Sequence, residues 1–288
     1  MEASLSITER IIWDAYENES RLIHIYPANG KYDIAYRTKS GMEKLITIQE
    51  DSFLEIDKIF IKNSSIISNE DNRRMHLQNE EEKSIQVTYQ KMQTVMGPRI
   101  TLKIWQLEKD VLPLTKISSD KNVIQTFKSW TEKKQGLFIV TGASGSGKTT
   151  TVFSLLNEFK NKGNVIFTIE NNVNLIVDGL NQVELKSSDA ALYNEAFDKV
   201  YSSDPDVICL GLSCDFENQE IIFKSAYHAA MLGHLVLLQM HQPNCKEALS
   251  YFKKYLKHEI EMNLISISSQ KLVSENGKIT AKYEFLTQ

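Results

Sequence analysis

The stretch that decides the fold begins with the apolar run Gly136-Leu137-Phe138-Ile139-Val140-Thr141 and continues as Gly142-Ala143-Ser144-Gly145-Ser146-Gly147-Lys148-Thr149. The first run has the length of a strand and lacks alternation, as expected where both faces of a sheet are covered. Residues 150–159 then continue as a helical segment. A strand, a glycine-rich loop and a helix in this order form the setting in which the pattern G-x-x-x-x-G-K-[ST] makes a P-loop.

Each part of this pattern has a chemical role. Glycines let the backbone N–H groups surround phosphate oxygens, and the helix N-terminus adds favourable dipole charge. Lys148 is predicted to reach the β- and γ-phosphates, and the Thr149 hydroxyl is predicted to hold Mg²⁺. We therefore expect ATP and Mg²⁺ as cofactors, bound through Gly142, Ala143, Ser144, Gly145, Ser146, Gly147, Lys148, Thr149 and Thr150. The alternative, a glycine-serine turn without a ligand, does not account for the flanking strand and helix.

Around the P-loop, apolar strand-like runs alternate with helical segments, which indicates βαβ units on a mainly parallel sheet. The expected elements are residues 136–141, 148–160, 164–170, 190–201, 206–210, 217–231, 234–240 and 246–258. The predicted fold class is therefore α/β, with a P-loop domain on a mainly parallel sheet over residues 121–288.

The first hundred residues have a different pattern, typical of a small α+β domain. Ser6-Ile7-Thr8-Glu9 has the form of a capping box before a helix that ends near Glu17. Asn29-Gly30 separates two alternating runs, which predicts a hairpin. More strands are expected near residues 85–90 and 99–106, and a long loop is expected within residues 63–83. We predict an N-terminal α+β domain over residues 1–108 and a linker over residues 109–120.

Composition excludes several classes of protein. The formal net charge is −4, so neither general nucleic-acid binding nor membrane-surface binding is indicated. The three cysteines, Cys209, Cys214 and Cys245, form no pair of CxxC motifs, which excludes a four-cysteine zinc site. No run approaches the roughly 20 apolar residues of a membrane span. We expect a cytoplasmic protein that binds no zinc and makes no direct contact with nucleic acid.

The order of motifs resembles one family, the ATPases of type II secretion, type IV pili and competence pseudopili (the GspE and PilB type). Besides the P-loop, four segments carry the resemblance: Phe167–Val173 resembles the acidic box, Asp204–Gly211 the Walker B strand, Gly233–His241 the histidine box, and Ser269–Val273 the Gln-Arg-Leu-Val segment. His24–Pro27 and Tyr36-Arg37 are similar to segments of the family's first domain. The short length and missing zinc cysteines are most similar to the compact competence form, the ComGA type.

The resemblance implies a RecA-like motor domain that hydrolyses ATP to assemble a competence pseudopilus or type IV pilus-like filament for DNA uptake. It implies that Glu170 is the general base, and it draws attention to His241 and His234 as further catalytic candidates. His241 ends a strand and is a candidate sensor of the γ-phosphate. The alternative for His241 is an ordinary strand-end histidine, and the alternative for His234 is a satisfied core residue. The expected partners are five more copies in a homo-hexamer and a polytopic inner-membrane platform protein, which places the ring at the inner face of the membrane.

The chain also departs from the family pattern. The Walker B strand ends in Gly211-Leu212 where the family has Gly-Glu, and Cys214 replaces an arginine. Asn171 and Asn174 stand where carboxylates are usual, and Asp215 or Glu217 are weak candidates to substitute. Because leucine cannot polarise a metal-bound water, hydrolysis is expected to be slow. Two hypotheses remain open: a motor ATPase, or a hydrolysis-impaired, nucleotide-gated scaffold or regulator of the same apparatus.

All arginines precede residue 100: Arg10, Arg21, Arg37, Arg73, Arg74 and Arg99. An arginine finger commonly accelerates phosphoryl transfer by several powers of ten. If one acts here, it comes from the first domain, and the resemblance implies that it comes from a neighbouring subunit. Arg73, Arg74 and Arg99 are the candidates, and the alternative for each is a solvated surface arginine.

Overall fold

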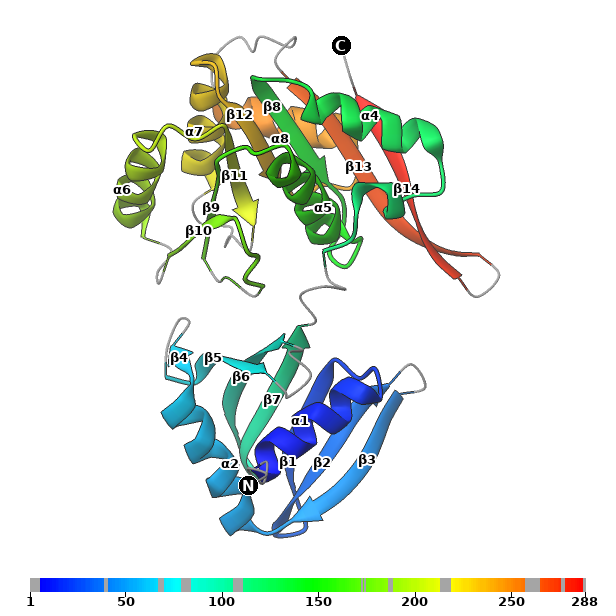
Figure 1. Ribbon diagram of the computed structural model, residues 1–288, viewed down its shortest axis with the longest axis vertical. Helices are drawn as coiled ribbons and strands as arrows, with labels where there is room; N and C mark the ends of the chain where they lie inside the picture. Colours follow the sequence, from blue (N-terminus) through cyan, green and yellow to red (C-terminus); the bar gives the residue numbers. More distant parts are fainter. Residues whose placement is uncertain are drawn as a thin grey trace. The chain divides into compact units, whose positions relative to one another are not determined.

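The computed structural model describes residues 6–38, 41–66, 70–78, 84–105, 111–171, 173, 175–185, 189–212, 219–256, 265–275 and 278–286. The chain divides into two compact units, both drawn in Figure 1. The first contains residues 1–107 and 174–176, and the second contains residues 108–173 and 177–288. Part of the predicted linker over residues 109–120 lies outside the described residues, and the rest includes a short 3-10 helix, η1 (Leu114–Lys116).

The first unit combines helices with a sheet in which every neighbouring pair of strands is antiparallel. The helices are α1 (Ile7–Glu17) and α2 (Glu50–Asn63). The strands are β1 (Leu22–Ala28), β2 (Lys31–Thr38), β3 (Gly41–Ile48), β4 (Ser65–Ile66), β5 (Asn72–Gln78), β6 (Ser84–Thr94) and β7 (Gly97–Trp105). Their order across the sheet is β3-β2-β1-β7-β6-β5-β4.

Local sequence accounts for several of these elements. Ser6 Oγ accepts a hydrogen bond from the Glu9 N–H at 3.2 Å, and the Glu9 carboxylate accepts one from the Ser6 N–H at 2.8 Å, which confirms the predicted capping box. Asn29 and Gly30 have positive φ angles and join β1 to β2, which confirms the predicted hairpin. Alternation along β1 sends Ile23 and Ile25 into a core that α1 and α2 cover.

The prediction of a long loop within residues 63–83 is wrong for much of that stretch, because β4 and β5 lie inside it. In β5 the buried positions include Arg73 and Met75, so polar side chains hide the strand pattern. Strand β3 and helix α2 were not predicted either. Strand β3 is an edge strand whose side chains are mostly exposed, so its sequence has no clear apolar alternation.

The second unit is built on a mixed sheet of strand order β10-β9-β11-β12-β8-β13-β14. Neighbouring strands are parallel from β10 to β13, and only the β13–β14 pair is antiparallel. The strands are β8 (Gly136–Thr141), β9 (Ile166–Glu170), β10 (Asn181–Glu184), β11 (Val207–Leu212), β12 (Leu235–Gln239), β13 (Ile265–Glu275) and β14 (Lys278–Leu286). The helices are α4 (Lys121–Thr131), α5 (Lys148–Asn161), α6 (Ala190–Tyr201), α7 (Gln219–Met231) and α8 (Cys245–Leu256).

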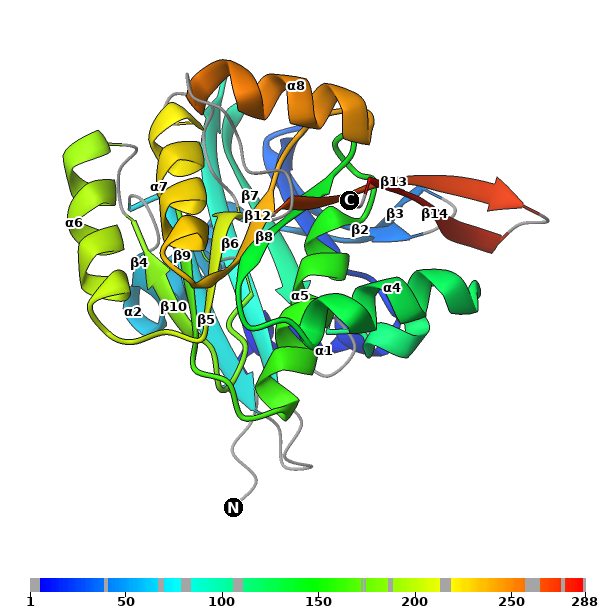
Figure 2. The same ribbon diagram turned by 90° about the horizontal axis from the view of Figure 1, so that it is seen from above.

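Helices cover both faces of this sheet, as Figure 2 shows from above. Leu137 and Ile139 of β8 belong to the core formed with α6, α7 and α8. The alternate residue Phe138 points to the other face, where its ring lies 4.9 Å from that of Trp130 on α4. Burial on both faces explains why the parallel strands read as continuous apolar runs.

The α/β prediction is confirmed, and the predicted strand and helix segments of the second unit recur with ends shifted by a few residues. Helix α4, strand β10 and the β13–β14 hairpin were not predicted. Since the strands are parallel, the carboxyl ends of β8, β9, β11 and β12 meet at one edge of the sheet. Within the described residues, no helix is long and apolar enough to cross a membrane.

Candidate functional site

The glycine-rich loop leaves the carboxyl end of β8 and passes directly into α5. Gly142, Gly145 and Gly147 all have positive φ angles, which glycine adopts without steric cost. A Cβ atom on Gly142 would lie 2.4 Å from the Gln270 carbonyl oxygen and 2.6 Å from Ser146 Oγ. The loop thus passes so close to β13 that only glycine fits at this point.

Lys148, the first residue of α5, is buried inside this loop. Its Nζ donates a hydrogen bond to the Ala143 carbonyl oxygen at 2.7 Å, and burial lowers the pKa of its ammonium group. The nearby Ser146 Oγ is buried and has no hydrogen-bond partner within the described residues. A buried cation held by a neutral carbonyl, beside an unused hydroxyl, is chemically suited to an anionic group such as phosphate.

Thr149 and Thr150 follow on the first turn of α5. Thr149 Oγ1 lies 3.4 Å from Gln239 Oε1, at the carboxyl end of β12. Thr150 turns toward a cavity instead, and its carbonyl oxygen accepts a hydrogen bond from Ser154 Oγ at 2.8 Å. Thr149 therefore faces the end of β12, whereas Thr150 lines the cavity.

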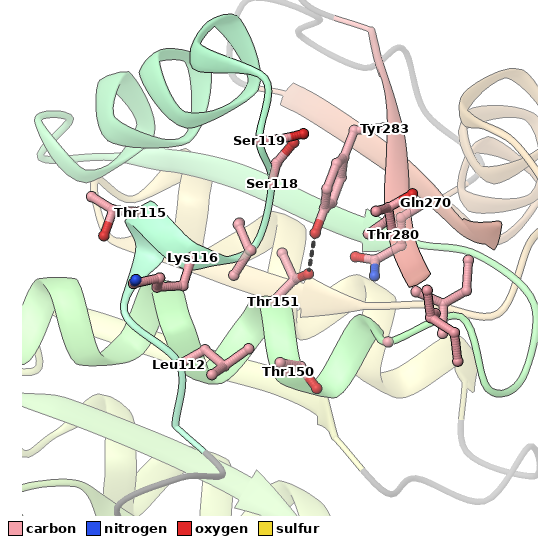
Figure 3. Close-up of a pocket in the computed structure, with 15 residues that line it drawn as sticks. Leu112, Thr115, Lys116, Ser118, Ser119, Thr150, Thr151, Gln270, Thr280 and Tyr283 are labelled. Atoms are coloured by element: carbon pink, nitrogen blue, oxygen red, sulfur yellow. Dashed lines mark hydrogen bonds between the residues drawn. The ribbon is translucent and has the colours of Figure 1, made fainter. Parts of the chain in front are cut away.

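A cavity of about 480 Å³ adjoins the end of the P-loop (Figure 3). Gly147, Thr150 and Thr151 form its side on α5, and the β13–β14 hairpin forms another side. Tyr283 of β14 and Thr151 share a hydrogen bond of 3.0 Å, drawn as a dashed line in Figure 3. The segment before α4 closes the third side with Leu112, Thr115, Lys116, Ile117, Ser118 and Ser119.

Glu170 ends β9 and is 2% exposed. One of its oxygens, Oε1, accepts hydrogen bonds from Thr168 Oγ1 at 2.6 Å and from Gln182 Nε2 at 3.0 Å. Two strands, β11 and β12, separate β9 from β8, so Glu170 lies three strand spacings, roughly 14 Å, from the end of β8. Glu170 is thus at the same edge of the sheet as the P-loop, oriented by two neutral donors.

His241 follows β12, the strand beside β8. The connection is fixed by Thr141, whose Oγ1 donates to the Gln242 carbonyl oxygen and accepts from the Gln242 N–H, both at 2.9 Å. Partial desolvation, and then the charge of Lys148, lower the pKa of His241. The structure therefore brings His241 into the electrostatic field of the P-loop lysine.

His234 lies at the other end of the same strand. It precedes the amino end of β12, whereas the P-loop follows the carboxyl end of the parallel strand β8. Its Nδ1 is 3.3 Å from the Pro205 carbonyl oxygen, and its ring packs against the edge of Tyr201. The structure does not bring His234 to the P-loop, and its contacts are those of a structural residue.

The predicted arginine candidates have different surroundings in the first unit. Arg73 is 8% exposed and donates to the carbonyl oxygens of Glu70 at 2.8 Å and Ile61 at 3.2 Å. Arg74 is 9% exposed. Arg99 is half-buried, with Nη2 3.1 Å from His24 Nδ1 and its guanidinium above the ring of Tyr26. Arg99 is thus the most accessible of the three.

Several departures from the family pattern also have structural positions. Leu212 ends β11, is 1% exposed and pairs with Glu170 across the two strands. Asn171 follows Glu170, whereas Asn174, Cys214, Asp215 and Glu217 lie outside the described residues.

Four residues with contacts at the site were not predicted from the sequence: Gln182, Gln239, Gln270 and Tyr283. Gln239 lies in the histidine box and Gln270 in the segment Ser269–Val273, but the sequence does not show which groups a neutral amide side chain contacts.

The comparisons with known proteins agree on one family. Residues 3–285 match the family described as Type II/IV secretion system protein. Competence protein ComGA of Bacillus subtilis is 27% identical over 96% of this chain and 80% of its own length. Type IV pilus assembly ATPase PilB of Myxococcus xanthus is 30% identical over 63% of this chain. The chain spans only 31% of that PilB and 26% of the type II secretion system protein E of Xanthomonas campestris.

Solved structures show the same fold. The pilus retraction motor PilT with bound ADP aligns with a TM-score of 0.74 at 21% identity, covering 99% of this chain and 83% of that one. The Legionella pneumophila ATPase DotB aligns with a TM-score of 0.68 at 17% identity, covering 96% of this chain and 79% of that one. Together with the match over residues 3–285, the motifs confirm the predicted resemblance. The chain belongs to the type II/IV secretion system protein family.

Proposed function

We propose that this chain is an ATP-binding motor ATPase that powers assembly of a competence pseudopilus or a type IV pilus-like filament. The observation that carries the proposal is the P-loop after β8, where a buried Lys148 lies beside the unused Ser146 hydroxyl. The parallel strands that converge on this loop support a RecA-like motor domain over residues 121–288. The coverage of ComGA favours the competence system within the family.

The residues of the loop fit a nucleotide phosphate and its metal. Lys148 exchanges the Ala143 carbonyl for a phosphate oxygen, which is the stronger, charge-assisted partner. Ser146 and the backbone N–H groups at the start of α5 supply further donors. Thr149 is the residue that would hold Mg²⁺, which when bound neutralises negative charge on the phosphate oxygens.

The cavity beside α5 suits the nucleoside. Its volume of about 480 Å³ lies within the usual range for small-ligand sites. Leu112, Leu272 and Ile279 offer apolar surface for a base, while Ser118 and Lys116 offer polar contacts for a ribose or for ring nitrogens. Because Gly147 and Thr150 line the same cavity, one nucleotide could place its phosphates in the loop and its base in the cavity.

Glu170 is the residue we assign as general base. Thr168 and Gln182 both donate to Oε1, which fixes the orientation of the carboxylate that would accept a proton from the attacking water. We assign His241 as the sensor of the γ-phosphate, since it shares the field of Lys148. We assign no catalytic role to His234, because it lies at the amino end of β12.

The proposed assembly is a homo-hexamer on a polytopic platform protein at the inner face of the membrane, with domains over residues 1–108 and 121–288. An arginine of the first domain then serves the site of a neighbouring subunit. Arg99 is the best candidate, because Arg73 is engaged by two backbone carbonyls and Arg74 is buried to a similar degree.

A second function, a hydrolysis-impaired scaffold or regulator gated by nucleotide, is favoured by one observation. Leu212 places an apolar, buried side chain beside Glu170 at the end of β11. Restoring a carboxylate with Leu212→Glu is expected to raise turnover if its loss limits hydrolysis. Unchanged turnover, with the variant folded, would mean that another residue already fills that role.

Steady-state ATP hydrolysis decides between the two functions. Wild type is compared with Lys148→Ala, which loses the phosphate cation, and with Glu170→Gln, which keeps the shape of the base but cannot accept a proton. The motor function predicts turnover well above both variants, with ATP binding kept in Glu170→Gln. Wild type that binds ATP but turns over no faster than Lys148→Ala would leave the scaffold as the function.

A further inference from the structure

The protein oxygen that the structure brings to Thr149 is that of a neutral amide. Thr149 Oγ1 and Gln239 Oε1 are 3.4 Å apart, at the long limit of a hydrogen bond. Gln239 is the last residue of β12 and is 6% exposed, so its side chain is held within the fold rather than in solvent. Two oxygens from α5 and β12 thus face each other without a tight bond between them.

The backbone around Gln239 is fixed by close packing. A Cβ atom on Gly211 would lie 2.2 Å from the Gln239 carbonyl oxygen, so β11 and β12 approach each other very closely there. The register of β11 against β9 shifts between Cys209 and Leu212, next to this contact. The backbone from which the Gln239 side chain extends is therefore held by the sheet.

No carboxylate competes with Gln239 for this place in the part of the chain that the structure describes. Leu212, at the end of the neighbouring strand, is buried and apolar. Glu170 is one strand farther away, and its Oε1 is engaged by Thr168 and Gln182. Across the described ranges, no group of three or more His, Cys, Asp or Glu side chains converges as a metal site.

We propose that Gln239 and Thr149 form a neutral site for the divalent cation of the bound nucleotide, with Gln239 Oε1 contacting the cation or its water. This inference rests on the proposed nucleotide binding and deepens it. Amide oxygens are accepted ligands for hard cations such as Mg²⁺, but a neutral oxygen attracts the cation less than a carboxylate does. A neutral amide also repels the phosphates less than a carboxylate would, so the affinity for the nucleotide should depend only weakly on the metal.

The test measures ADP affinity by calorimetry with excess Mg²⁺ and again with excess EDTA. The ratio of the two dissociation constants is the metal increment, which requires no hydrolysis. Wild type is expected to show an increment of less than about tenfold, since the two protein oxygens of the proposed site, those of Gln239 and Thr149, are neutral. Gln239→Leu should reduce the increment to the part that Thr149 supplies, and Gln239→Glu should raise it at least about tenfold by adding one negative charge.

Matched variants keep the test independent of folding defects. Gln125→Glu adds the same charge on an exposed face of α4 and should leave the increment unchanged. Gln239→Asn keeps the amide but shortens it, so it should behave like Gln239→Leu if Oε1 contacts the cation or its water. Thermal melting identifies any variant that does not fold. If Gln239→Leu does not fold, Gln239→Asn, the mildest change, takes its place in the test.

The possible outcomes separate this inference from the proposed function. If the metal increment changes as expected in the Gln239 variants but wild type does not hydrolyse ATP, the neutral site is supported and the motor function is rejected. A wild-type increment above a hundredfold, or one unaltered in folded Gln239→Leu and Gln239→Asn, overturns the neutral site, whatever the turnover. Absence of ADP binding in wild type overturns both.

Discussion

At Gly142 two constraints act together: the φ angle is 149°, and a Cβ atom would lie 2.4 Å from the Gln270 carbonyl oxygen. The backbone of the P-loop cannot move away from β13 without also moving the turn in which Ser146 N–H bonds to the Ala143 carbonyl oxygen at 3.2 Å. A single side chain at this position therefore affects the whole phosphate cradle. The absence of a side chain at Gly142 is therefore a condition for the loop conformation that binds phosphate.

Gly142→Ala is expected to weaken ATP binding by at least about tenfold, because the loop must shift away from Gln270 and Ser146. Fluorescence titration with an ATP analogue measures the loss. The matched control is Gly163→Ala, which also has a positive φ angle but meets no atom within 4 Å. It should cost about 1–2 kcal/mol of folding stability from backbone strain alone and leave binding intact. Equal binding by both variants would contradict the steric argument.

His241 gives the site a predictable pH dependence. In the unliganded protein, desolvation and then the charge of Lys148 hold the pKa of His241 below 6.5. A bound triphosphate brings negative charge and raises that pKa, so binding takes up protons as the pH falls below about 6.5. Affinity should therefore strengthen with falling pH in wild type more than in His241→Gln.

Calorimetry in two buffers of different ionisation enthalpy measures this proton uptake. The phosphate of the nucleotide also titrates in this range, so the quantity of interest is the difference between wild type and His241→Gln. His228→Gln, on the exposed surface of α7, should match wild type. If His241→Gln takes up as many protons as wild type, the phosphate does not reach His241.

Among the elements, the β13–β14 hairpin holds the P-loop in place from the side. Gln270 Nε2 on β13 donates to the Ser146 carbonyl oxygen at 2.8 Å, and Tyr283 on β14 bonds to Thr151 on α5. Strand β13 also pairs with β8 in parallel. One hairpin thus fixes the strand before the loop, the loop itself and the helix after it.

Gln270→Ala should lower the free energy of unfolding by about 1–3 kcal/mol, because the buried Ser146 carbonyl loses its partner and the side chain leaves a void. Urea denaturation followed by circular dichroism gives the value. Lys271→Ala, at the next and exposed position of the same strand, should change it by less than about 0.5 kcal/mol. Equal stability of the two variants would show that the hairpin does not support the loop.

Sequence patterns anticipated the elements that carry a local signal. The strand 136–141, the loop glycines and the helix start at Lys148 all follow from neighbouring residues. The hairpin contact does not, since Gln270 and Ser146 are 124 residues apart. Gln239 and Gln182 were likewise unpredictable, because strand order alone brings their amides to Thr149 and Glu170. For His234 the sequence left a catalytic and a structural role open, and the structure places it at the amino end of β12, away from the P-loop.

At the scale of the whole molecule, the chemistry is divided between two units that each have their own core. The P-loop, Glu170 and His241 belong to the second unit, and all six arginines belong to the first. A guanidinium at the transferring phosphate accelerates phosphoryl transfer by about 10³ to 10⁵. An arginine that serves the P-loop would therefore come from a first unit, and in the proposed ring it comes from the first unit of a neighbouring subunit.

Mixed rings test this arrangement directly. Arg99→Ala chains keep the P-loop but lack the arginine, and Lys148→Ala chains keep the arginine but lack the P-loop cation. Each alone should fall by about a thousandfold or more in turnover. An equal mixture should recover activity, because random assembly gives roughly a quarter of the interfaces both groups. The control mixes Arg99→Ala with the Lys148→Ala, Arg99→Ala double variant, which supplies no arginine. Recovery in the first mixture alone requires a site shared between subunits, whereas no recovery in either would assign Arg99 to its own subunit or to the structure of the sheet.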